Sequence, residues 1–129
     1  MLTAPTRDEA GFNSGKVYVY DGATATELWS KNGLVVGGWS GHDAACAGDV
    51  TGDGVNDVIA GAPNAASGRF YVYDGLTGDL AWLQNGQASG DEMGFRVYGG
   101  GDFNGDGITD LVTGAPGHDT AGNAAGRVY

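Results

Sequence analysis

The feature that most constrains the fold is an acidic decapeptide that occurs twice. GDVTGDGVND covers residues 48–57, and GDFNGDGITD covers residues 101–110, so equivalent positions are 53 residues apart. Each copy leads within a few residues into the tripeptide GAP, at 61–63 and at 114–116. Self-similarity at a fixed period of this size is the signature of a repeat architecture. The chain is therefore expected to fold as stacked copies of one small unit.

Each unit contains four short apolar stretches separated by turn residues. The tripeptides TAP at 3–5 and GAP at 61–63 and 114–116 each precede a polar loop and then a β-rich run. These runs are GKVYVYDG at 15–22, GRFYVYDG at 68–75 and GRVY at 126–129. The first two runs are followed by tryptophan-bearing segments, TELWSKNG at 26–33 and GDLAWLQNG at 78–86. We expect repeat units at approximately 3–60 and 61–113, with a partial third unit starting at 114–129.

Four short strands joined by turns make one small antiparallel sheet. The VYVY and FYVY runs are apolar at consecutive positions, so both faces of that strand should be buried. A meander covered on both faces by its neighbours is a propeller blade. The sequence therefore predicts an all-β fold, a single partial β-propeller segment over residues 1–129. It holds about two blade equivalents, out of phase with the blade boundary. A two-sheet sandwich would have similar strands but needs no repeated loop at a fixed offset.

Composition supports a folded chain and excludes some partners. The chain has 26 glycines and 3 prolines, close to the level of disordered sequences, but its 3 Trp, 6 Tyr and 4 Phe lie in apolar runs. Net charge is −10 and the six Lys and Arg are scattered, so we expect no nucleic-acid partner and no anionic membrane surface. No stretch is long enough for a transmembrane helix. The opening MLTAPTRDEAG has no apolar core, so no signal peptide is predicted in this chain.

The acidic loops have the ligand spacing of a calcium site. Calcium takes six to eight oxygen ligands, and positions 1, 3, 5, 7 (main chain) and 9 of a loop can surround one ion. Glycine at position 6, Gly54 or Gly107, suits a sharp turn with positive φ. The sequence therefore predicts two calcium ions per chain. The first site is Asp49, Thr51, Asp53, the main chain of Val55, and Asp57; the second is Asp102, Asn104, Asp106, the main chain of Ile108, and Asp110.

Three alternatives to calcium-binding propeller loops are weaker. EF-hands and dockerins need an acidic ligand at position 12, where this chain has Ala60 and Thr113, and strand-like residues follow. Magnesium requires a strict octahedron that crowded loops tolerate poorly. A polar turn without metal would leave three carboxylates within nine residues to repel one another.

With these motifs in place, the chain resembles the FG-GAP repeat family. GDVTGDGVNDVIAGAP and GDFNGDGITDLVTGAP, each followed by GRFYVYDG or GRVY, are similar to the blades of the integrin α-subunit propeller and of many bacterial secreted proteins. The segment YDGLTGDLAW is closest in style to bacterial extracellular repeats. The resemblance implies a β-propeller, calcium in the loops between strands 1 and 2, and an extracellular or cell-surface location. The slot of the family's Phe-Gly holds Ser40-Gly41 and Met93-Gly94 instead.

The candidate catalytic motifs lack required residues or spacings, so the chain is not expected to be an enzyme. GFNSGKV at 11–17 lacks the spacing and the Ser or Thr of a phosphate loop. GGWSGHD at 37–43 places Ser40, His42 and Asp43 side by side but lacks the GxSxG elbow. Cys46 is the single cysteine, which excludes an intrachain disulfide. Trp39 lies outside the strand pattern and is a candidate carbohydrate platform.

The predicted function is a non-enzymatic calcium-binding propeller module with a structural, adhesion or recognition role, its loops contacting a protein or glycan. The alternative is a propeller segment of a secreted lipase or polysaccharide-degrading enzyme, or a lectin-like propeller. Two blades cannot close a ring, so we expect a homo-oligomer, a trimer or tetramer ring. Blades would be shared between chains, with strands 3 and 4 from the next N-terminus completing strands 1 and 2 near the C-terminus. In such a ring, the tail from about Gly117 is then expected to be loose or bound elsewhere.

Overall fold

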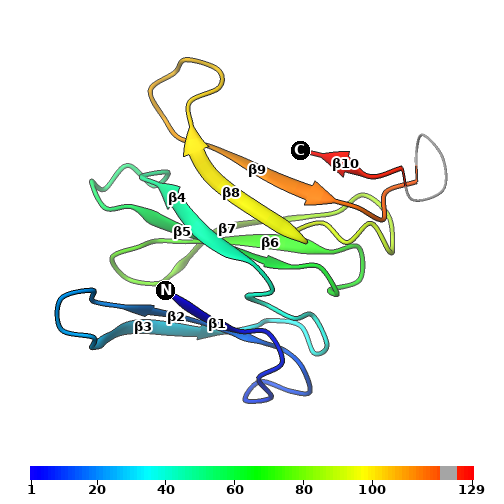
Figure 1. Cartoon of the computed structure of the whole chain (residues 1–129), viewed down its shortest axis with the longest axis horizontal. Coiled ribbons are helices and arrows are strands. Elements are labelled where there is room, and N and C mark those ends of the chain that lie inside the picture. The colour runs from blue at the N-terminus through cyan, green and yellow to red at the C-terminus, as the bar shows by residue number, and fades with distance from the viewer. Residues whose placement is uncertain (120–124) are drawn as a thin grey trace.

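The computed structural model describes residues 1–119 and 125–129, and these residues form ten β-strands (Figure 1). The strands are β1 Leu2–Ala4, β2 Lys16–Tyr20, β3 Glu27–Asn32, β4 Ala44–Gly48, β5 Asp57–Ala62, β6 Arg69–Tyr73, β7 Leu80–Asn85, β8 Arg96–Gly101, β9 Asp110–Ala115 and β10 Arg127–Val128. None of the described residues forms a helix long and apolar enough to span a membrane. The expected all-β class is confirmed.

The strands form three antiparallel sheets stacked one on the next (Figure 1). The middle sheet, β4-β5-β6-β7, is a complete four-stranded meander in chain order. The first sheet is β1-β2-β3, and the third is β8-β9-β10. The chain is therefore one whole propeller blade between two partial blades, which confirms that the repeats are out of phase with the blade boundary.

Irregularities in the ladders recur at equivalent positions. The register shifts between Cys46 and Gly48 where β4 pairs with β5, and between Gly99 and Gly101 where β8 pairs with β9. A bulge in a strand increases its local twist and redirects the chain. Here each shift comes directly before an acidic loop, so the two loops leave their sheets in the same way.

Two apolar clusters lie between the three sheets. The first joins the first and second sheets and includes Val17, Trp29, Tyr71 and Tyr73; the second joins the second and third sheets and includes Ile59, Phe70, Val72 and Val97. All residues of β5 are buried, and so is the FYVY run of β6. This confirms burial on both faces for β5 and β6 of the middle sheet. The VYVY run of β2 is mostly half-buried, because the first sheet is covered on one face only.

The turns that lack the family's phenylalanine keep their place through main-chain contacts. Ser40 and Met93 are both buried, and they form isolated parallel bridges with Gly15 and Gly68. A side chain added at Gly15 or Gly68 would overlap the main chain of the residue it faces. Glycine is required here because two backbones touch. The stacking of the sheets at these turns therefore depends on main-chain contacts and does not require the phenylalanine.

Each end of the chain forms a short edge strand. Leu2–Ala4 forms β1, a strand that the sequence did not predict. In the single chain, β10 pairs with β9, and the Tyr129 and Thr113 main chains exchange two hydrogen bonds. The expectation of a tail that is loose or bound elsewhere concerns the assembled ring and stays a prediction. His118 is buried with its Nδ1 3.1 Å from Asp91 Oδ2. The edge of β9 offers unpaired groups, and the nearest segment able to pair with them does so. Residues 120–124 of the tail lie outside the described residues.

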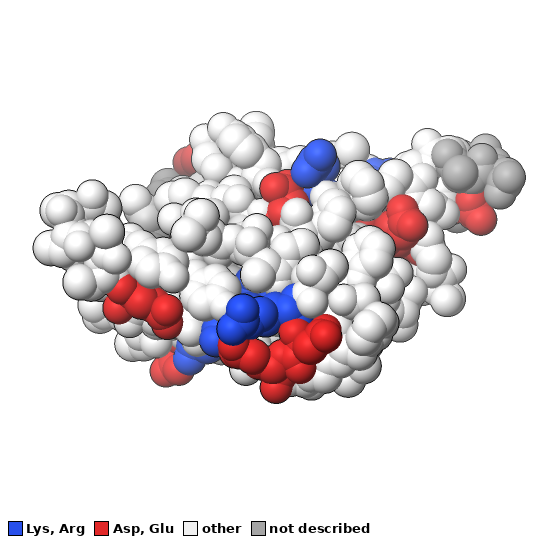
Figure 2. Space-filling model, turned by 60° about the horizontal axis from the view of Figure 1, so that its bottom comes forward, with Lys and Arg blue, Asp and Glu red and all other residues white. Residues whose placement is uncertain are grey.

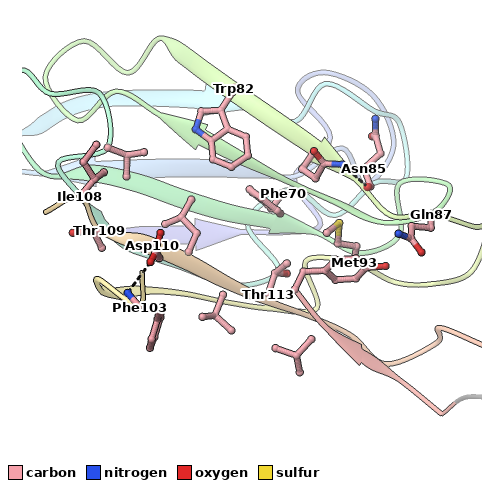
Figure 3. Close-up of a pocket in the computed structure, with 16 residues that line it drawn as sticks. Phe70, Trp82, Asn85, Gln87, Met93, Phe103, Ile108, Thr109, Asp110 and Thr113 are labelled. Atoms are coloured by element: carbon pink, nitrogen blue, oxygen red, sulfur yellow. Dashed lines mark hydrogen bonds between the residues drawn. The ribbon is translucent and has the colours of Figure 1, made fainter. Parts of the chain in front are cut away.

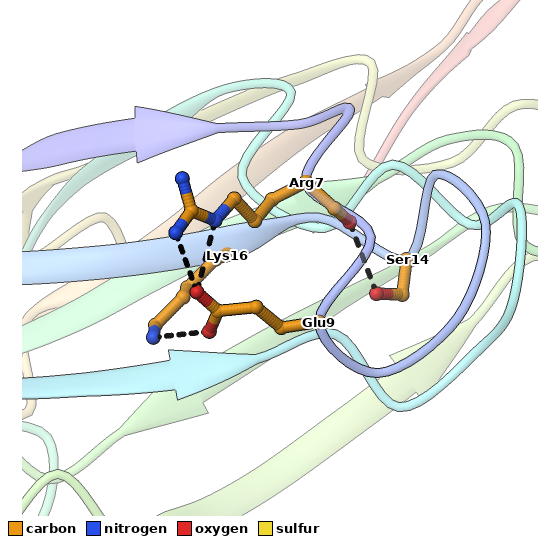
Figure 4. A network of polar contacts seen from close by, with 4 residues as sticks. All are labelled: Arg7, Glu9, Ser14 and Lys16. Atoms are coloured by element: carbon orange, nitrogen blue, oxygen red, sulfur yellow. Dashed lines mark hydrogen bonds and ion pairs between the residues drawn. The ribbon is translucent and has the colours of Figure 1, made fainter.

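The polar loop before β2 is held by an exposed network (Figure 4). Glu9 accepts from Arg7 Nη2 and from Lys16 Nζ, each at 2.6 Å, and Ser14 Oγ donates to the Arg7 carbonyl at 3.2 Å. Exposed ion pairs add little stability, so this network orders the loop and stabilises the fold only slightly. Figure 2 shows that Lys and Arg side chains on this face lie beside acidic ones and form no basic stripe.

Candidate metal-binding loops

The acidic loops lie at the same end of the stacked sheets (Figure 1). One runs over 49–56 between β4 and β5, and the other over 102–109 between β8 and β9. Most residues of both loops are exposed to solvent. Two equivalent acidic turns therefore lie at one end of the molecule, one on each of two consecutive sheets.

The first aspartate of each loop organises the turn with its carboxylate. Asp49 Oδ1 accepts from the N–H of Gly52 at 2.7 Å and of Asp53 at 3.0 Å, and its Oδ2 accepts from Gly54 at 2.9 Å. Asp102 accepts from Gly105, Asp106 and Gly107 in the same way, at 2.6, 3.0 and 2.8 Å. Hydrogen bonds from these N–H groups, of which that of Gly107 has the largest effect, hold the pKa of Asp102 below its usual range. The carboxylate is therefore charged at neutral pH.

The last aspartate of each loop ties the turn back to the sheet. Asp57 Oδ2 accepts from the N–H of Val50 and of Thr51, both at 2.8 Å. Its Oδ1 accepts from Gly75 N at 2.9 Å, in the turn after β6. Asp57 is 1% exposed, so it is a buried anchor as well as a predicted ligand. Sequence analysis did not find the contact with Gly75, because that residue lies 18 positions away in another turn.

Asp110 has the position in the second loop that Asp57 has in the first, and it accepts fewer hydrogen bonds. Its Oδ2 accepts from Phe103 N at 2.7 Å and from Asn104 N at 3.3 Å. Asp110 is half-buried, and the described residues include no third N–H donor equivalent to Gly75. The third sheet has no turn after β10 in the described part of the chain, which explains the difference.

The middle ligands of each loop point into solvent. Asp53 Oδ1 accepts from Val55 N at 2.8 Å, and Asp106 Oδ1 accepts from Ile108 N at 2.8 Å. Asn104 donates its Nδ2 to Asp106 Oδ2 at 3.1 Å, whereas the Thr51 hydroxyl lies 3.4 Å from Asp57 Oδ1. Val55 and Ile108, predicted to bind through the main chain, thus fix the side chain of position 5.

The donor set fits calcium by its chemistry, but the structure does not gather it. All predicted ligands are oxygens, which hard cations prefer. Gly54 and Gly107 both have φ of +88°, as the predicted sharp turn requires. Among the residues described, however, no three His, Cys, Asp or Glu side chains are placed to hold one ion. Asp53 and Asp106 are exposed, so their side chains have room to turn toward positions 1 and 9. The ten-residue ligand set stays a prediction.

The residues of the rejected GGWSGHD motif have structural contacts. The ring of His42 lies parallel to that of Trp39, with centroids 6.3 Å apart, and 4.8 Å from the ring of Phe95. Asp43 Oδ2 accepts from Val97 N at 3.0 Å and so links the second and third sheets. Ser40 is buried. Trp39 is 36% exposed and has φ of +57°. This aromatic group lies at the end of the sheets opposite the acidic loops.

Comparison with known proteins gives consistent matches. The FG-GAP repeat model matches residues 43–73 and 94–129. Integrin alpha pat-2 of Caenorhabditis briggsae is 38% identical over 88% of this chain. Integrin alpha-PS5 of Drosophila melanogaster is 32% identical over 100% of it, and human integrin alpha-11 is 29% identical over 92%. The chain spans 10%, 14% and 11% of these three relatives. Together with the stacked four-stranded repeats, these matches show that the chain belongs to the FG-GAP repeat family and has its propeller-blade fold.

Proposed function

We propose that this chain is a non-enzymatic, calcium-binding β-propeller module of an extracellular adhesion or recognition protein, completed by self-association into a ring. The observation that carries the proposal is the duplicated loop. In both turns, 53 residues apart, the carboxylates at positions 1, 5 and 9 accept hydrogen bonds from equivalent main-chain N–H groups. A polar turn of no further use would not need the same three carboxylates twice.

Calcium binding is supported by the charge and chemistry of these loops. Asp49, Thr51, Asp53, Val55 (main chain) and Asp57 would hold one ion, and Asp102, Asn104, Asp106, Ile108 (main chain) and Asp110 the other. A bound calcium ion supplies positive charge that neutralises the carboxylates. The chain's own N–H groups already preorganise positions 1 and 9, so the exposed carboxylates at position 5 are the groups that must turn.

The recognition role is supported by family membership and by one surface. The relatives are named as integrin α-subunits. Trp39, His42 and Phe95 form an aromatic group before β4 and β8, at the end opposite the acidic loops. Aromatic surfaces of this kind bind proteins or sugars. Stacking on Trp39 would favour a glycan, which keeps a lectin-like propeller as the second candidate.

Ring formation is supported by the uncovered face of the first sheet. Tyr18 and Tyr20 of β2 are equivalent to Tyr71 and Tyr73 of β6, which are buried at 0% and 2% exposure, yet they lie on a face that no other sheet covers. Repeat units bury their apolar faces only by stacking. A trimer would provide six blades and a tetramer eight. A propeller segment of a secreted lipase or polysaccharide-degrading enzyme is the competing class, and activity on ester or glycoside substrates would favour it.

Calcium titration of the purified chain tests the proposal. We expect two ions per chain, and a melting temperature that rises with calcium because the ion binds the native state. Asp53→Ala and Asp106→Ala should each remove one ion. Asp79→Ala is the matched control, since Asp79 is a highly exposed aspartate outside the loops and should remove none. An unchanged melt in chelator would refute the calcium role.

A further inference from the structure

A cavity of about 830 Å³ separates the outer part of the second sheet from the third sheet (Figure 3). Phe70 and Trp82 line one side, and Leu111, Thr113 and Tyr129 line the other. Trp82 is 41% exposed, although its ring packs edge-on against Phe70 at 5.3 Å between centroids. A half-exposed tryptophan beside a large apolar cavity marks a surface that another group can cover.

The equivalent place between the first and second sheets is filled. Trp29 is the counterpart of Trp82, 53 residues earlier, and is only 8% exposed. It packs against Tyr73 at 6.0 Å between ring centroids, and its Nε1 donates to the Gly75 carbonyl at 2.9 Å. Strand β6 and the turn after it thus cover Trp29. The third sheet has no equivalent of Tyr73 and Gly75 among the described residues.

The two shortest strands, β1 and β10, lie where longer strands lie in a complete blade. Strand β1 pairs Leu2 with Tyr18 and Ala4 with Lys16, as β5 pairs Ala60 with Tyr71 and Ala62 with Arg69. Strand β1 therefore takes the place on β2 that a second strand of a blade would have. Likewise, β10 pairs Arg127 with Ala115, as Arg69 pairs with Ala62.

These edge strands are the parts most easily exchanged. Strand β1 has three residues and β10 has two, and nearly all of them are exposed. Each covers only part of an edge that a full strand would cover. An edge strand with unpaired groups is a template for pairing with another chain.

We propose that the cavity is the seat of the β2–β3 hairpin, residues 16–32, of a second copy of this chain. The hairpin displaces β10 and pairs with β9 from Leu111 opposite Tyr20 to Ala115 opposite Lys16, the register of β5 on β6. Five residue pairs replace the three of β1 and the two of β10. The completed blade has the strand order of β4-β5-β6-β7. This inference rests on the ring proposed above and specifies its interface.

The seated hairpin satisfies the groups around the cavity. Tyr18 and Tyr20 of the second copy enter the cavity, as Tyr71 and Tyr73 enter the first cluster. Tyr18 takes the position that Tyr129 has in the single chain. The indole Nε1 of Trp82 then donates to the Gly22 carbonyl of the second copy, as Trp29 donates to Gly75. The interface is heterologous, because the hairpin of one copy meets the seat of the next, and the constant rotation from blade to blade of a propeller closes such a series into a ring.

Two lysine substitutions test the hairpin and its seat separately. Tyr20→Lys damages the hairpin and Val112→Lys damages the β9 side of the seat, and both residues lie outside the two core clusters. We expect wild type to form rings by native mass spectrometry and each variant to remain a monomer that still binds calcium. Mixing the variants should give a 1:1 dimer, because one intact hairpin then meets one intact seat. Leu28→Lys is the control: its counterpart Ala81 is exposed in the complete blade, so rings should persist.

Cross-linking tests the register. In a Cys46→Ser background, Val19→Cys with Val112→Cys should form a disulfide between chains, because directly opposed residues approach closely enough. Val17→Cys with Val112→Cys is displaced by two residues and should not. Rings formed by either lysine variant, a mixture that stays monomeric, or a cross-link only at residue 17 would overturn the seat. In each of these cases two bound calcium ions would leave the calcium role standing. A wild-type monomer with two ions would overturn the ring and the seat together.

Discussion

The indole Nε1 of Trp29 donates a hydrogen bond of 2.9 Å to the carbonyl oxygen of Gly75, 46 residues along the chain. This bond joins β3 of the first sheet to the turn after β6 of the second. Trp82 has the same position in the next repeat and lies at the open cavity. The pair therefore shows what a covered and an uncovered tryptophan look like in the same fold.

Trp29→Phe should lower the free energy of unfolding by about 1 kcal/mol, the usual net value of one hydrogen bond. Urea denaturation of a monomeric Val112→Lys chain measures this loss without any contribution from assembly. Trp82→Phe in the same background is the control and should cost less, because Trp82 is 41% exposed and its indole donates no hydrogen bond to the described residues. Equal losses in the two variants would contradict the role given to the Gly75 contact.

Asp57→Ala should destabilise the calcium-free chain by about 2 kcal/mol more than Asp110→Ala. Asp57 is buried and accepts from three main-chain N–H groups, which the substitution leaves without their partner. Asp110 is half-buried and accepts from two. Chemical denaturation in excess chelator compares them. If the two variants unfold alike, the bond between Asp57 and Gly75 adds nothing.

Stability of the calcium-free chain should fall with acid below about pH 5. The N–H group of Thr24 lowers the pKa of Asp21, and that of Thr77 lowers the pKa of Asp74. A carboxyl whose pKa is lower in the folded chain stabilises it fully above the unfolded pKa, near 3.9. That stabilisation is lost as the pH falls through the folded pKa. Urea midpoints at pH 6, 4 and 3 measure the loss.

The matched control for this pH dependence is the double variant Asp21→Asn with Asp74→Asn. Asparagine keeps a side-chain oxygen that can accept from the same turns but has no proton to gain. The difference between pH 6 and pH 3 should therefore be smaller than in the parent chain. A parent chain equally stable at both values would refute the prediction.

Removal of residues 117–129 should leave the ring intact. Strand β10 covers the edge of β9 only at Arg127 and Val128, and the hairpin of a second copy is expected to take that edge. Native mass spectrometry of a chain ending at Pro116 counts the copies. Loss of assembly in this truncated chain would show that the tail, and not the hairpin of a neighbour, completes the third blade.

The repeat predicted much of this fold because the motifs of each unit mark its strands in order. The acidic decapeptide, the GAP tripeptide and the YVYDG run fixed where strands begin, and the consecutive apolar residues of FYVY predicted burial on both faces. Strand β1 was missed, because LTA has no pattern of its own that predicts a strand and its pairing depends on the open edge of β2. Strand β10 lies within the GRVY run, which the repeat had marked as β-rich.

The candidate site divides in the same way. Spacing was enough to place Asp49 and Asp102 at the head of equivalent turns, since their hydrogen bonds are local. The burial of Asp57 depends on Gly75, which belongs to another turn and is brought close only by the sheet. Sequence alone could not separate a buried anchor from an exposed ligand at the same loop position.

Glycine 15 and glycine 68 meet the main chains of Ser40 and Met93 with no side chain between them. At these points the spacing between one sheet and the next is set by main-chain contact alone. Side chains elsewhere in a repeat can then diverge without changing that spacing. During evolution, whole units could be duplicated, deleted or exchanged between related chains, and each newcomer would stack at the distance its predecessor kept.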